Sequence, residues 1–178
     1  ITIKNNYDIK SSYFSNGDQI IINNNTFETW LGLFVINSSR IINNSFSPTL
    51  TSISFKGDNT QFIDNNFLNP NTGIFTFGNS SNNSFYYNNF STSEYNIYFN
   101  STISENTFNT SFNNSAQGNI YSDYCDKGVD NNGDGYADAS SSGTTDWPYS
   151  ANITSKVYDA SPGNTGVIDY GPFIQSCP

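Results

Sequence analysis

The chain contains no histidine and no methionine, and its charged side chains are few. Without histidine, a Ser-His or Cys-His nucleophile pair cannot be built. Six Lys and Arg residues stand against 15 Asp and Glu, which gives a formal net charge of −9. Nucleic acid is not expected as a partner, because binding to phosphates needs clustered cations. No membrane span is expected either, because no apolar run approaches the ~18 residues that a membrane-spanning helix needs.

The chain begins at Ile1 rather than Met, which suggests a mature, secreted or cell-surface form whose signal peptide has been removed. Only two cysteines occur, Cys125 and Cys177. In a secreted chain they favour one disulfide, formed in an oxidising compartment, and two free buried thiols are the alternative. The length of 178 residues suits a single domain.

Asparagine and aromatic residues are abundant, with 30 and 29 residues respectively. Many of them belong to an internal repeat, in which an apolar residue, two variable residues, Asn, a small polar residue and Phe follow one another. The copies read INNNTF at 22–27, IINNSF at 41–46, FIDNNF at 62–67, FYYNNF at 85–90 and ISENTF at 103–108. The closing phenylalanines are 19, 21, 23 and 18 residues apart.

The spacing inside each copy predicts a bend. Two apolar positions five residues apart face opposite sides of a straight strand, so both can face a core only if the chain turns between them. Asn suits such a turn, because it tolerates the left-handed conformation and bonds its own backbone. Stacked turns would then form a ladder of Asn side chains. The predicted ladder residues are Asn25, Asn44, Asn65, Asn88 and Asn106, with the core residues Phe27, Phe46, Phe67, Phe90 and Phe108.

A second kind of strand lies between the copies, marked by apolar residues two apart near a turn signal. The pairs are Phe34 and Ile36, Ile53 and Phe55, Phe75 and Phe77, and Ile97 and Phe99. Coils of about 20 residues with three short strands each are typical of an all-β parallel β-helix, here of about six coils with almost no α-helix. An antiparallel β-sandwich is the rival fold, but it would not need the same bend residue in five places.

The ends of the repeat are less regular. Residues 1–19 suggest a degenerate first coil with Ile3, Ile9 and Tyr13 in the core, and residues 109–124 a degenerate last coil. We therefore expect coils over residues 1–124. Residues 125–178 would form an irregular cap, packed on the coils as one compact domain.

The coils and the segment after them resemble a known family, the NosD-like (CASH-type) right-handed parallel β-helix repeats of secreted and surface proteins. The segment reads GNIYSDYCDKGVDNNGDGYAD at 118–138, followed by WPY at 147–149. It is similar to the family's GNxWSDY step and DxNGDGxxD loop, and departs from them at Ile120, Tyr121 and Cys125. The resemblance implies right-handed coils. It leaves the function open, since such repeats serve in copper-enzyme maturation, carbohydrate-active enzymes and surface proteins.

The acidic loop in this segment has the spacing of an EF-hand-type calcium site. Asp130, Asn132 and Asp134 alternate, as ligands at positions 1, 3 and 5 do, and Gly135 follows at position 6. The carbonyl of Tyr136 and the side chain of Asp138 would take positions 7 and 9. Position 12 is Ser141 rather than Glu, so another acid would complete the shell, with Asp126, Asp123 and Asp146 as candidates. An Asx-rich turn that binds nothing is the alternative.

Bound Ca²⁺ would have a structural role. Together with the Cys125–Cys177 link it would hold the cap on the last coil, because a β-helix otherwise exposes ladder groups and core aromatics at its end.

The sequence does not favour an enzyme. Asp64 and Glu105 both stand three residues before a closing Phe, but Asn24, Asn43 and Tyr87 occupy the same place in other copies, as expected of a variable outward position. A carbohydrate-binding or carbohydrate-active β-helix is the alternative function. A sugar could stack on the tyrosines Tyr86, Tyr87, Tyr95 and Tyr98, although tyrosines in β-coils often serve only packing.

Attached sugar is also possible on this weakly charged surface. The acceptor pattern Asn-x-Ser/Thr occurs at Asn24, Asn37, Asn43, Asn79, Asn82, Asn89, Asn100, Asn109, Asn113 and Asn152, a number only slightly above chance. The sequence thus favours a structural extracellular protein, a calcium-stabilised glycoprotein of a cell-surface layer or filament. Its expected partner is itself, assembled head-to-tail or side by side.

Overall fold

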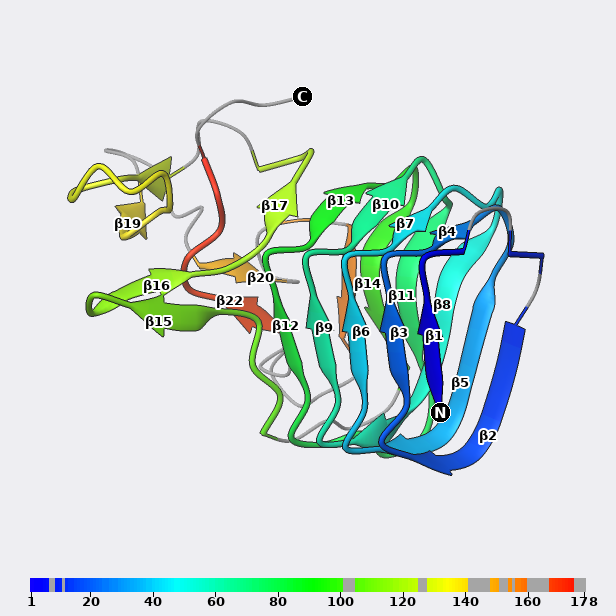
Figure 1. The fold of residues 1–178 in the computed structure, drawn as a ribbon. Coiled ribbons are helices and arrows are strands. Elements are labelled where there is room, and N and C mark those ends of the chain that lie inside the picture. The colour runs from blue at the N-terminus through cyan, green and yellow to red at the C-terminus, as the bar shows by residue number, and fades with distance from the viewer. Residues whose placement is uncertain are drawn as a thin grey trace.

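The computed structural model describes residues 1–6, 9–10, 12–100, 105–124, 128–140, 148–150, 154, 156–159 and 167–174. Three parallel sheets wind into a β-helix of about five turns (Figure 1). The described part of the chain contains no α-helix, and so none long and apolar enough to cross a membrane. The expected all-β parallel β-helix is therefore confirmed, and the β-sandwich is excluded because the main sheets pair in parallel.

The strands fall into three stacked sheets and three small ones. Sheet A contains β1 (Thr2–Lys4), β3 (Ile21–Asn23), β6 (Arg40–Ile42), β9 (Gln61–Ile63) and β12 (Ser84–Tyr86). Sheet B contains β4 (Thr26–Phe27), β7 (Ser45–Phe46), β10 (Asn66–Leu68), β13 (Asn89–Ser91) and β17 (Ile120–Tyr121). Sheet C contains β2 (Ser12–Asp18), β5 (Leu31–Asn37), β8 (Thr51–Asp58), β11 (Thr72–Thr76), β14 (Tyr95–Phe99) and β21 (Val157–Asp159). The antiparallel pairs are β15 (Thr110–Phe112) with β16 (Ser115–Gln117), β18 (Gly128–Val129) with β19 (Ala139–Ser140), and β20 (Tyr149–Ser150) with β22 (Ile168–Asp169).

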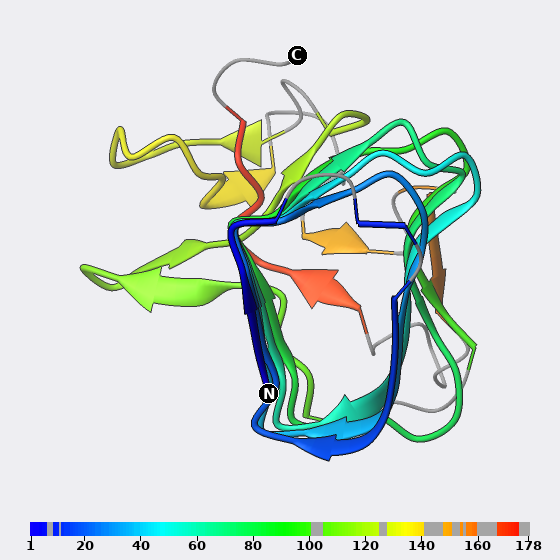
Figure 2. The same cartoon turned by 45° about the vertical axis from the view of Figure 1, so that its right-hand side comes forward.

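Figure 2 shows the three sheets surrounding one core. Corresponding residues of successive turns lie directly over one another. In sheet B the rings of Phe67 and Phe90 stack with their centroids 4.7 Å apart, and in sheet A those of Phe62 and Phe85 stack at 4.8 Å. All four side chains are fully buried. Burying each stabilises the fold by roughly 1.5–3 kcal/mol, and ring stacking adds to this.

A ladder of buried Asn side chains follows the corner between sheets A and B. The backbone N–H and the Nδ2 of Asn25 both donate to Oδ1 of Asn44, each at 3.0 Å. Asn44 donates in the same way to Asn65, and Asn65 to Asn88, again at 3.0 Å. The expected Asn ladder is confirmed at these four positions. It also has a direction, because every turn donates to the next turn along the chain.

The bend itself is formed by the residue before each ladder Asn. Asn24, Asn43, Asp64 and Tyr87 have φ between 53° and 58°, whereas the ladder residues do not have positive φ. Our placement of the left-handed bend at the ladder Asn was therefore wrong by one residue. The ladder Asn must point its amide along the inner corner, so the outward residue before it takes the turn. The presence of Tyr87 shows that the ladder imposes this conformation, because a Tyr does not favour it.

The structure places the fifth copy of the repeat at a different corner from the one expected. Oδ1 of Asn106 accepts the N–H of Asn83 at 2.8 Å, and Phe108 stacks on Phe85 at 4.9 Å. Both residues thus lie at the corner between sheets C and A, one strand earlier in the turn than expected. That corner also contains residues in the left-handed conformation, such as Asn82 and Glu105, so the same Asn-x-Phe sequence pattern fits it.

Asn119 and Tyr121 occupy the place expected for Asn106 and Phe108. Oδ1 of Asn119 accepts the N–H of Asn88 at 3.1 Å and its Nδ2 at 2.9 Å. The ring of Tyr121 stacks on Phe90 at 5.4 Å. The last step of the ladder is therefore formed by the sequence Asn-Ile-Tyr, in which an aromatic residue again follows Asn by two positions.

The last turn is incomplete, which explains why about five turns form rather than six. Residues 110–117 leave the corner as the antiparallel hairpin β15–β16 instead of continuing the coil (Figure 1). The sixth strand of sheet C is β21, which comes from residues 157–159 and pairs with β14. The C-terminal segment thus contributes a strand to the helix that it covers.

Sheet C differs from the expected pairs at three aromatic residues. Ile53, Phe55, Ile97 and Phe99 are buried as expected, and so is Ile36. Phe34, Phe75 and Phe77 instead lie half-buried on the outer face, and Leu33 and Ile74 fill the core in their strands. In β5 the register shifts between Phe34 and Ile36, which explains why the two do not share a face. Tyr13 is 61% exposed, contrary to expectation, while its neighbour Phe14 packs against the core.

Candidate functional site

The two ends of the β-helix differ. At the N-terminal end, β1 and β2 each pair with one neighbour among the described strands. At the other end the final turn is covered by C-terminal residues. There β21 pairs with β14, Phe173 bridges to Ile120, and Tyr149 stacks on Tyr121. We call the end formed by residues 1–6, 9–10 and 12–18 the open end, and the covered final turn the closed end.

A buried carboxylate terminates the Asn ladder at the closed end. Oδ2 of Asp169 accepts the N–H of Asn119 at 2.8 Å and its Nδ2 at 3.0 Å, and it also accepts the hydroxyl of Tyr121 at 3.2 Å. Oδ1 accepts the N–H of Gly171 at 3.0 Å. Every ladder Asn needs an acceptor on the next turn. A carboxylate provides acceptors without bringing N–H groups that would need partners of their own.

Asp169 is fully buried, and this burial raises its pKa to about 7. The hydrogen bonds from Asn119, Gly171 and Tyr121 act in the lowering direction. The charge of Asp169 also raises the pKa of two tyrosines. Burial, with the charge of Asp169, holds the pKa of Tyr121 well above its ordinary value, and burial raises that of Tyr136 to about 12. No sequence motif marks Asp169, because its role depends on the ladder that it meets.

A second polar cluster fastens the cap to the final turn. Nδ2 of Asn96 donates to Oδ1 of Asp123 at 2.9 Å and to the hydroxyl of Tyr149 at 2.6 Å. The Tyr149 hydroxyl donates to Oδ1 of Asp123 at 3.1 Å, and Thr154 donates to the other carboxylate oxygen. The ring of Tyr149 lies 3.6 Å from that of Tyr121. Asp123, one of the candidate calcium ligands, therefore serves to hold the cap.

The open end exposes backbone groups. In β1, the carbonyl of Ile1 accepts the N–H of Ile21 at 2.8 Å, and the N–H of Asn5 donates to the carbonyl of Asn23 at 3.2 Å. Backbone groups of alternate residues in a strand point to opposite neighbours, so those of Thr2 and Lys4 point away from β3. The carbonyl of Lys4 accepts Nδ2 of Asn6 at 3.1 Å, and among the described residues no strand pairs with this edge. A strand edge of this kind is a template for a further strand.

The open end also differs from the inner turns in the hydrogen bonding of Asn6 and in the burial of its apolar residues. Asn6 donates to Oδ1 of Asn25 from its N–H at 3.1 Å and from its Nδ2 at 3.2 Å. Among the described residues, none donates to Oδ1 of Asn6 in turn. Ile9 and Phe14 pack against the core but are only partly buried. Within the described residues, the open end thus receives no strand, amide donors or apolar cover of the kind that each inner turn receives from its neighbour.

The acidic loop is folded around Asp130. Oδ1 of Asp130 accepts the N–H groups of Asn132 at 3.2 Å, Gly133 at 2.6 Å and Asp134 at 3.2 Å, and Oδ2 accepts that of Gly135 at 2.8 Å. These bonds lower the pKa of the exposed Asp130. The pKa of Asp134 is also lowered, despite desolvation, by bonds that include the Tyr136 N–H and the Gln117 side chain.

Asp134 and Asp138 both bond to side chains of β16. Oδ2 of Asp134 accepts from Nε2 of Gln117 at 3.2 Å. The two carboxylate oxygens of Asp138 accept from the N–H of Asn131 at 2.9 Å and the hydroxyl of Ser115 at 3.3 Å. Among the described residues, no group of three or more Cys, Asp and Glu side chains is placed to hold one metal ion. The expected ligand set also includes the Asn132 amide, the Tyr136 carbonyl and Asp126, so calcium binding here stays a prediction.

Several predicted site residues lie outside the described part of the chain. These are the candidate ligands Asp126 and Asp146, position 12 at Ser141, the disulfide residues Cys125 and Cys177, and the acceptor Asn152. The remaining acceptor residues all reach the surface. Asn24, Asn43, Asn79, Asn82, Asn100 and Asn113 are exposed, and Asn37, Asn89 and Asn109 are half-buried.

The candidate acids and tyrosines do not form one site. Asp64 precedes the ladder at the corner between sheets A and B, whereas Glu105 lies at the corner between sheets C and A. Tyr86 and Tyr87 contact each other, and Tyr87 also contacts Tyr136 beside the acidic loop. Tyr95 and Tyr98 instead contact each other on sheet C.

An aromatic stripe follows the outer face of sheet C. Its members are Tyr13, Phe34, Phe77, Phe75, Tyr98 and Tyr158, joined by successive ring contacts. The rings of Tyr98 and Tyr158 are nearly parallel, 13° apart, with centroids 4.3 Å apart. Rings stacked in this way cover one another's faces, and a sugar ring stacks on a face. The geometry therefore favours packing within the stripe over sugar binding.

Comparison of the chain with protein-family models, curated proteins and solved structures found no match. The assignment as a parallel β-helix repeat protein therefore rests on the fold itself.

The buried carboxylate predicts an unusual dependence of stability on pH. Asp169 has a pKa of about 7 in the folded chain and 3.8 in the unfolded one. Between these values the folded chain holds the proton and the unfolded chain releases it. The free energy of unfolding therefore falls as pH rises from about 4 to about 7, by an amount on the order of 4 kcal/mol.

Urea unfolding of the wild type and of Asp169→Asn, at several pH values in this window, measures the effect. The variant keeps an oxygen acceptor for Asn119 but does not titrate, so its stability relative to the wild type should improve as pH rises. Parallel pH profiles for the two proteins would contradict the assignment.

Proposed function

We propose that this chain is a structural extracellular protein, a subunit of a cell-surface layer or filament, rather than an enzyme. The observation that carries the proposal is the difference between the two ends of the β-helix. The closed end satisfies its ladder with Asp169, whereas the open end presents β1, β2 and Asn6 without a described partner on that side. An edge of this kind is a binding surface for another polypeptide.

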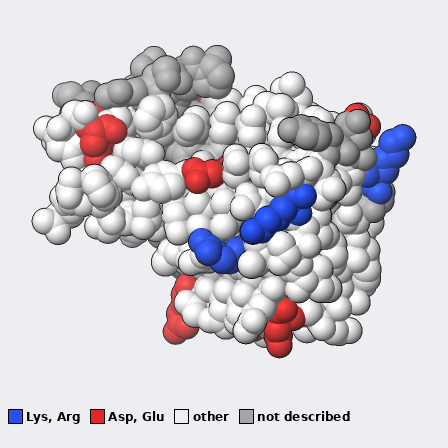
Figure 3. All heavy atoms as spheres, in the orientation of Figure 1, with Lys and Arg blue, Asp and Glu red and all other residues white. Residues whose placement is uncertain are grey.

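The shape of the molecule favours an open polymer. A contact that joins the open end of one copy to a different surface of the next copy is heterologous, and repeating it produces a filament unless the rotation closes a ring. The fully buried aromatic ladders make each subunit a rigid element of such a polymer. Figure 3 shows that few charged side chains lie on the face it displays. Copies could therefore approach with little repulsion there, despite the net charge of −9.

Calcium belongs to the proposal as a structural cofactor of the acidic loop. The support is the ligand spacing from Asp130 to Asp138, with both Asp130 and Asp134 ionised at neutral pH. Because loop amides occupy the oxygens of Asp130, binding requires some of these hydrogen bonds to be exchanged. We expect an affinity in the range of extracellular calcium modules, with Kd about 10⁻⁴–10⁻³ M.

Isothermal titration of the chain with CaCl₂ tests the calcium proposal. We expect a saturable heat that Asp130→Asn combined with Asp134→Asn abolishes, and that Asp18→Asn, an exposed acid far from the loop, leaves intact. Absence of heat in the wild type at millimolar calcium would remove calcium from the account.

N-linked sugar is proposed at the exposed acceptors, since the chain carries few charges to keep an extracellular surface soluble. The intact mass of protein from its natural source measures this, because occupied sites raise it above 19.7 kDa. A location at the cell surface, and membership of the NosD-like group of β-helix repeats, are parts of the same proposal. They are supported by the family-like segment at 118–138 that follows the coils.

The assembly proposal predicts the effect of blocking the open edge. Lys4→Pro removes an N–H that points away from β3 and leaves the bonds of Ile1 and Asn5 to β3 in place. Analytical ultracentrifugation should show concentration-dependent assembly of the wild type and of Lys4→Gln, which removes only the charge. Lys4→Pro should stay monomeric with an unchanged circular dichroism spectrum. A wild type that is monomeric at every concentration would refute the proposed function.

A further inference from the structure

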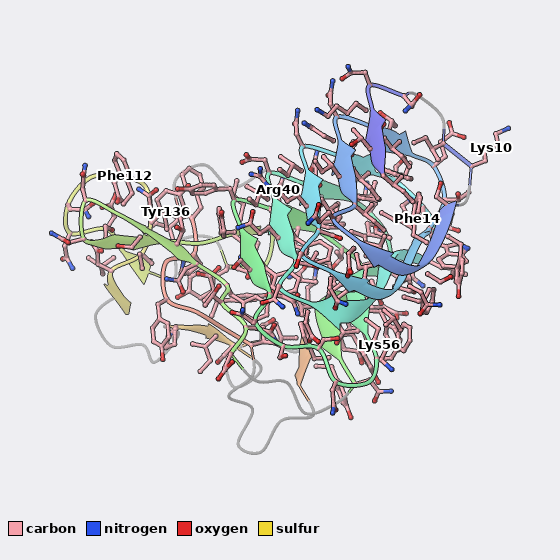
Figure 4. All side chains as sticks on the ribbon, turned by 60° about the horizontal axis from the view of Figure 1, so that its bottom comes forward. Lys10, Phe14, Arg40, Lys56, Phe112 and Tyr136 are labelled. Atoms are coloured by element: carbon pink, nitrogen blue, oxygen red, sulfur yellow. The ribbon has the colours of Figure 1, made fainter. Side chains whose placement is uncertain are left out.

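A lysine amine lies against the last turn of the β-helix. Lys156 directly precedes β21, and its Nζ donates to the backbone carbonyl of Thr92 at 2.5 Å. Lys156 is half-buried, whereas Lys10 is exposed and extends away from the ribbon (Figure 4). The amine of Lys156 is thus held at the corner before β14 rather than in solvent.

Asn96 lies beside Lys156 in sheet C. Strands β14 and β21 pair in parallel, and in their register the N–H of Asn96 donates to the carbonyl of Lys156 at 2.8 Å. Side chains at corresponding positions of parallel strands point to the same face. At this position the face is the core, because a Cβ on Gly73, one turn earlier, would lie 2.9 Å from the buried ring of Phe90.

The amide of Asn96 is bonded at both of its polar atoms. Its Oδ1 accepts the hydroxyl of Thr92 at 2.6 Å. Its Nδ2 donates to Oδ1 of Asp123 at 2.9 Å and to the hydroxyl of Tyr149 at 2.6 Å. Asn96 and Tyr149 are fully buried, and Thr92 is 5% exposed. Thr92 therefore contacts both groups, since its hydroxyl bonds the amide oxygen of Asn96 and its carbonyl bonds the amine of Lys156.

This arrangement contains the parts of an amide exchange reaction. The Thr92 hydroxyl can stabilise the negative charge that develops on Oδ1 of Asn96 when a nucleophile adds to Cγ. The Asp123 carboxylate can carry protons to Nδ2, to which it is already bonded. The amine of Lys156, once deprotonated, is the nucleophile. Because Asn96 is fully buried, water has little access to compete with the amine.

We propose that Lys156 and Asn96 become joined by an isopeptide bond within one chain. Nζ of Lys156 moves from the carbonyl of Thr92 and attacks Cγ of Asn96. The bond between Nζ and Cγ forms, and the bond between Cγ and Nδ2 breaks. The two protons that the Lys156 ammonium loses pass through Asp123 to Nδ2, which leaves as ammonium. One amide replaces another, so the step requires no oxidant and no cofactor.

The bond would fasten β21 covalently to β14 and so keep the closed end covered. It forms within a single copy, and it therefore stands or falls independently of calcium binding and of assembly.

Mass spectrometry of the reduced chain, produced without glycosylation, tests the bond. Loss of ammonia should lower the intact mass of the wild type by about 17 Da below the sequence mass. Lys156→Arg keeps a cation for the carbonyl of Thr92 but lacks the nucleophilic amine, so it should show the full sequence mass with an unchanged circular dichroism spectrum. Lys56→Arg, which changes another half-buried lysine, is the matched control and should keep the loss.

Succinimide formation at an asparagine also releases ammonia, so a protease digest must decide where the mass is lost. We expect one linked peptide pair that contains Asn96 and Lys156. A wild type at full sequence mass, without a linked pair after prolonged incubation, would overturn the inference and leave the proposed function untouched. A mass loss that persists in Lys156→Arg would also overturn it.

The role of Asp123 has its own test. Asp123→Asn keeps an acceptor for Nδ2 of Asn96 but removes the carboxylate that carries protons. After refolding from urea, its mass loss should proceed at least about tenfold more slowly than that of the wild type. An equal rate would show that Asp123 does not take part in the step.

Discussion

The structure depends on a chain of buried amide hydrogen bonds. Each ladder Asn must both accept from the turn before and donate to the turn after, and a buried amide left unpaired costs roughly 1–3 kcal/mol per group. The requirement fixes the register of every turn, because slipping by one residue would break two bonds at each step. It also explains the left-handed residue before each ladder Asn, even where that residue is Tyr87.

The need to pair every ladder amide also explains the difference between the two ends of the β-helix. A directed ladder has an unused donor at one end and an unused acceptor at the other. Asp169 accepts the last donors in a fully buried site, and the turn that it closes is further held by Tyr149 and Asp123. In the first turn, no described residue donates to Oδ1 of Asn6, and no described strand pairs with the outer edges of β1 and β2. The proposed mode of assembly follows from this asymmetry.

Much of the fold could be predicted from the sequence, because a repeated turn repeats its residues. The phenylalanine ladder and the Asn ladder at Asn25, Asn44, Asn65 and Asn88 required only periodicity. The predicted position of Asn106 was wrong because two corners of the β-helix have the same local sequence pattern, so the pattern alone does not distinguish them. The outward placement of Phe34 depends on a bulge in β5, which sequence spacing does not reveal.

The site was less predictable, since its members come from distant parts of the chain. Asp169 stands alone in the sequence, and its role exists only where a donor ladder ends. The hairpin β15–β16 was read as a coil because its residues resemble those of the coils. The acidic loop was recognisable by its spacing, but the bonds of its side chains to loop amides and to Gln117 of β16 were not.

The most direct test of this account is the effect of removing one ladder amide on the free energy of unfolding. Asn65→Ala removes the acceptor of the N–H and Nδ2 of Asn44 and one of the two donors to Oδ1 of Asn88, which keeps the backbone N–H of residue 65. Asn79→Ala, at an exposed position, is the matched control. The account predicts a loss of roughly 3 kcal/mol or more for the first variant and under about 0.5 kcal/mol for the second. A loss at Asn65 no larger than that at Asn79 would show that the ladder does not organise the fold.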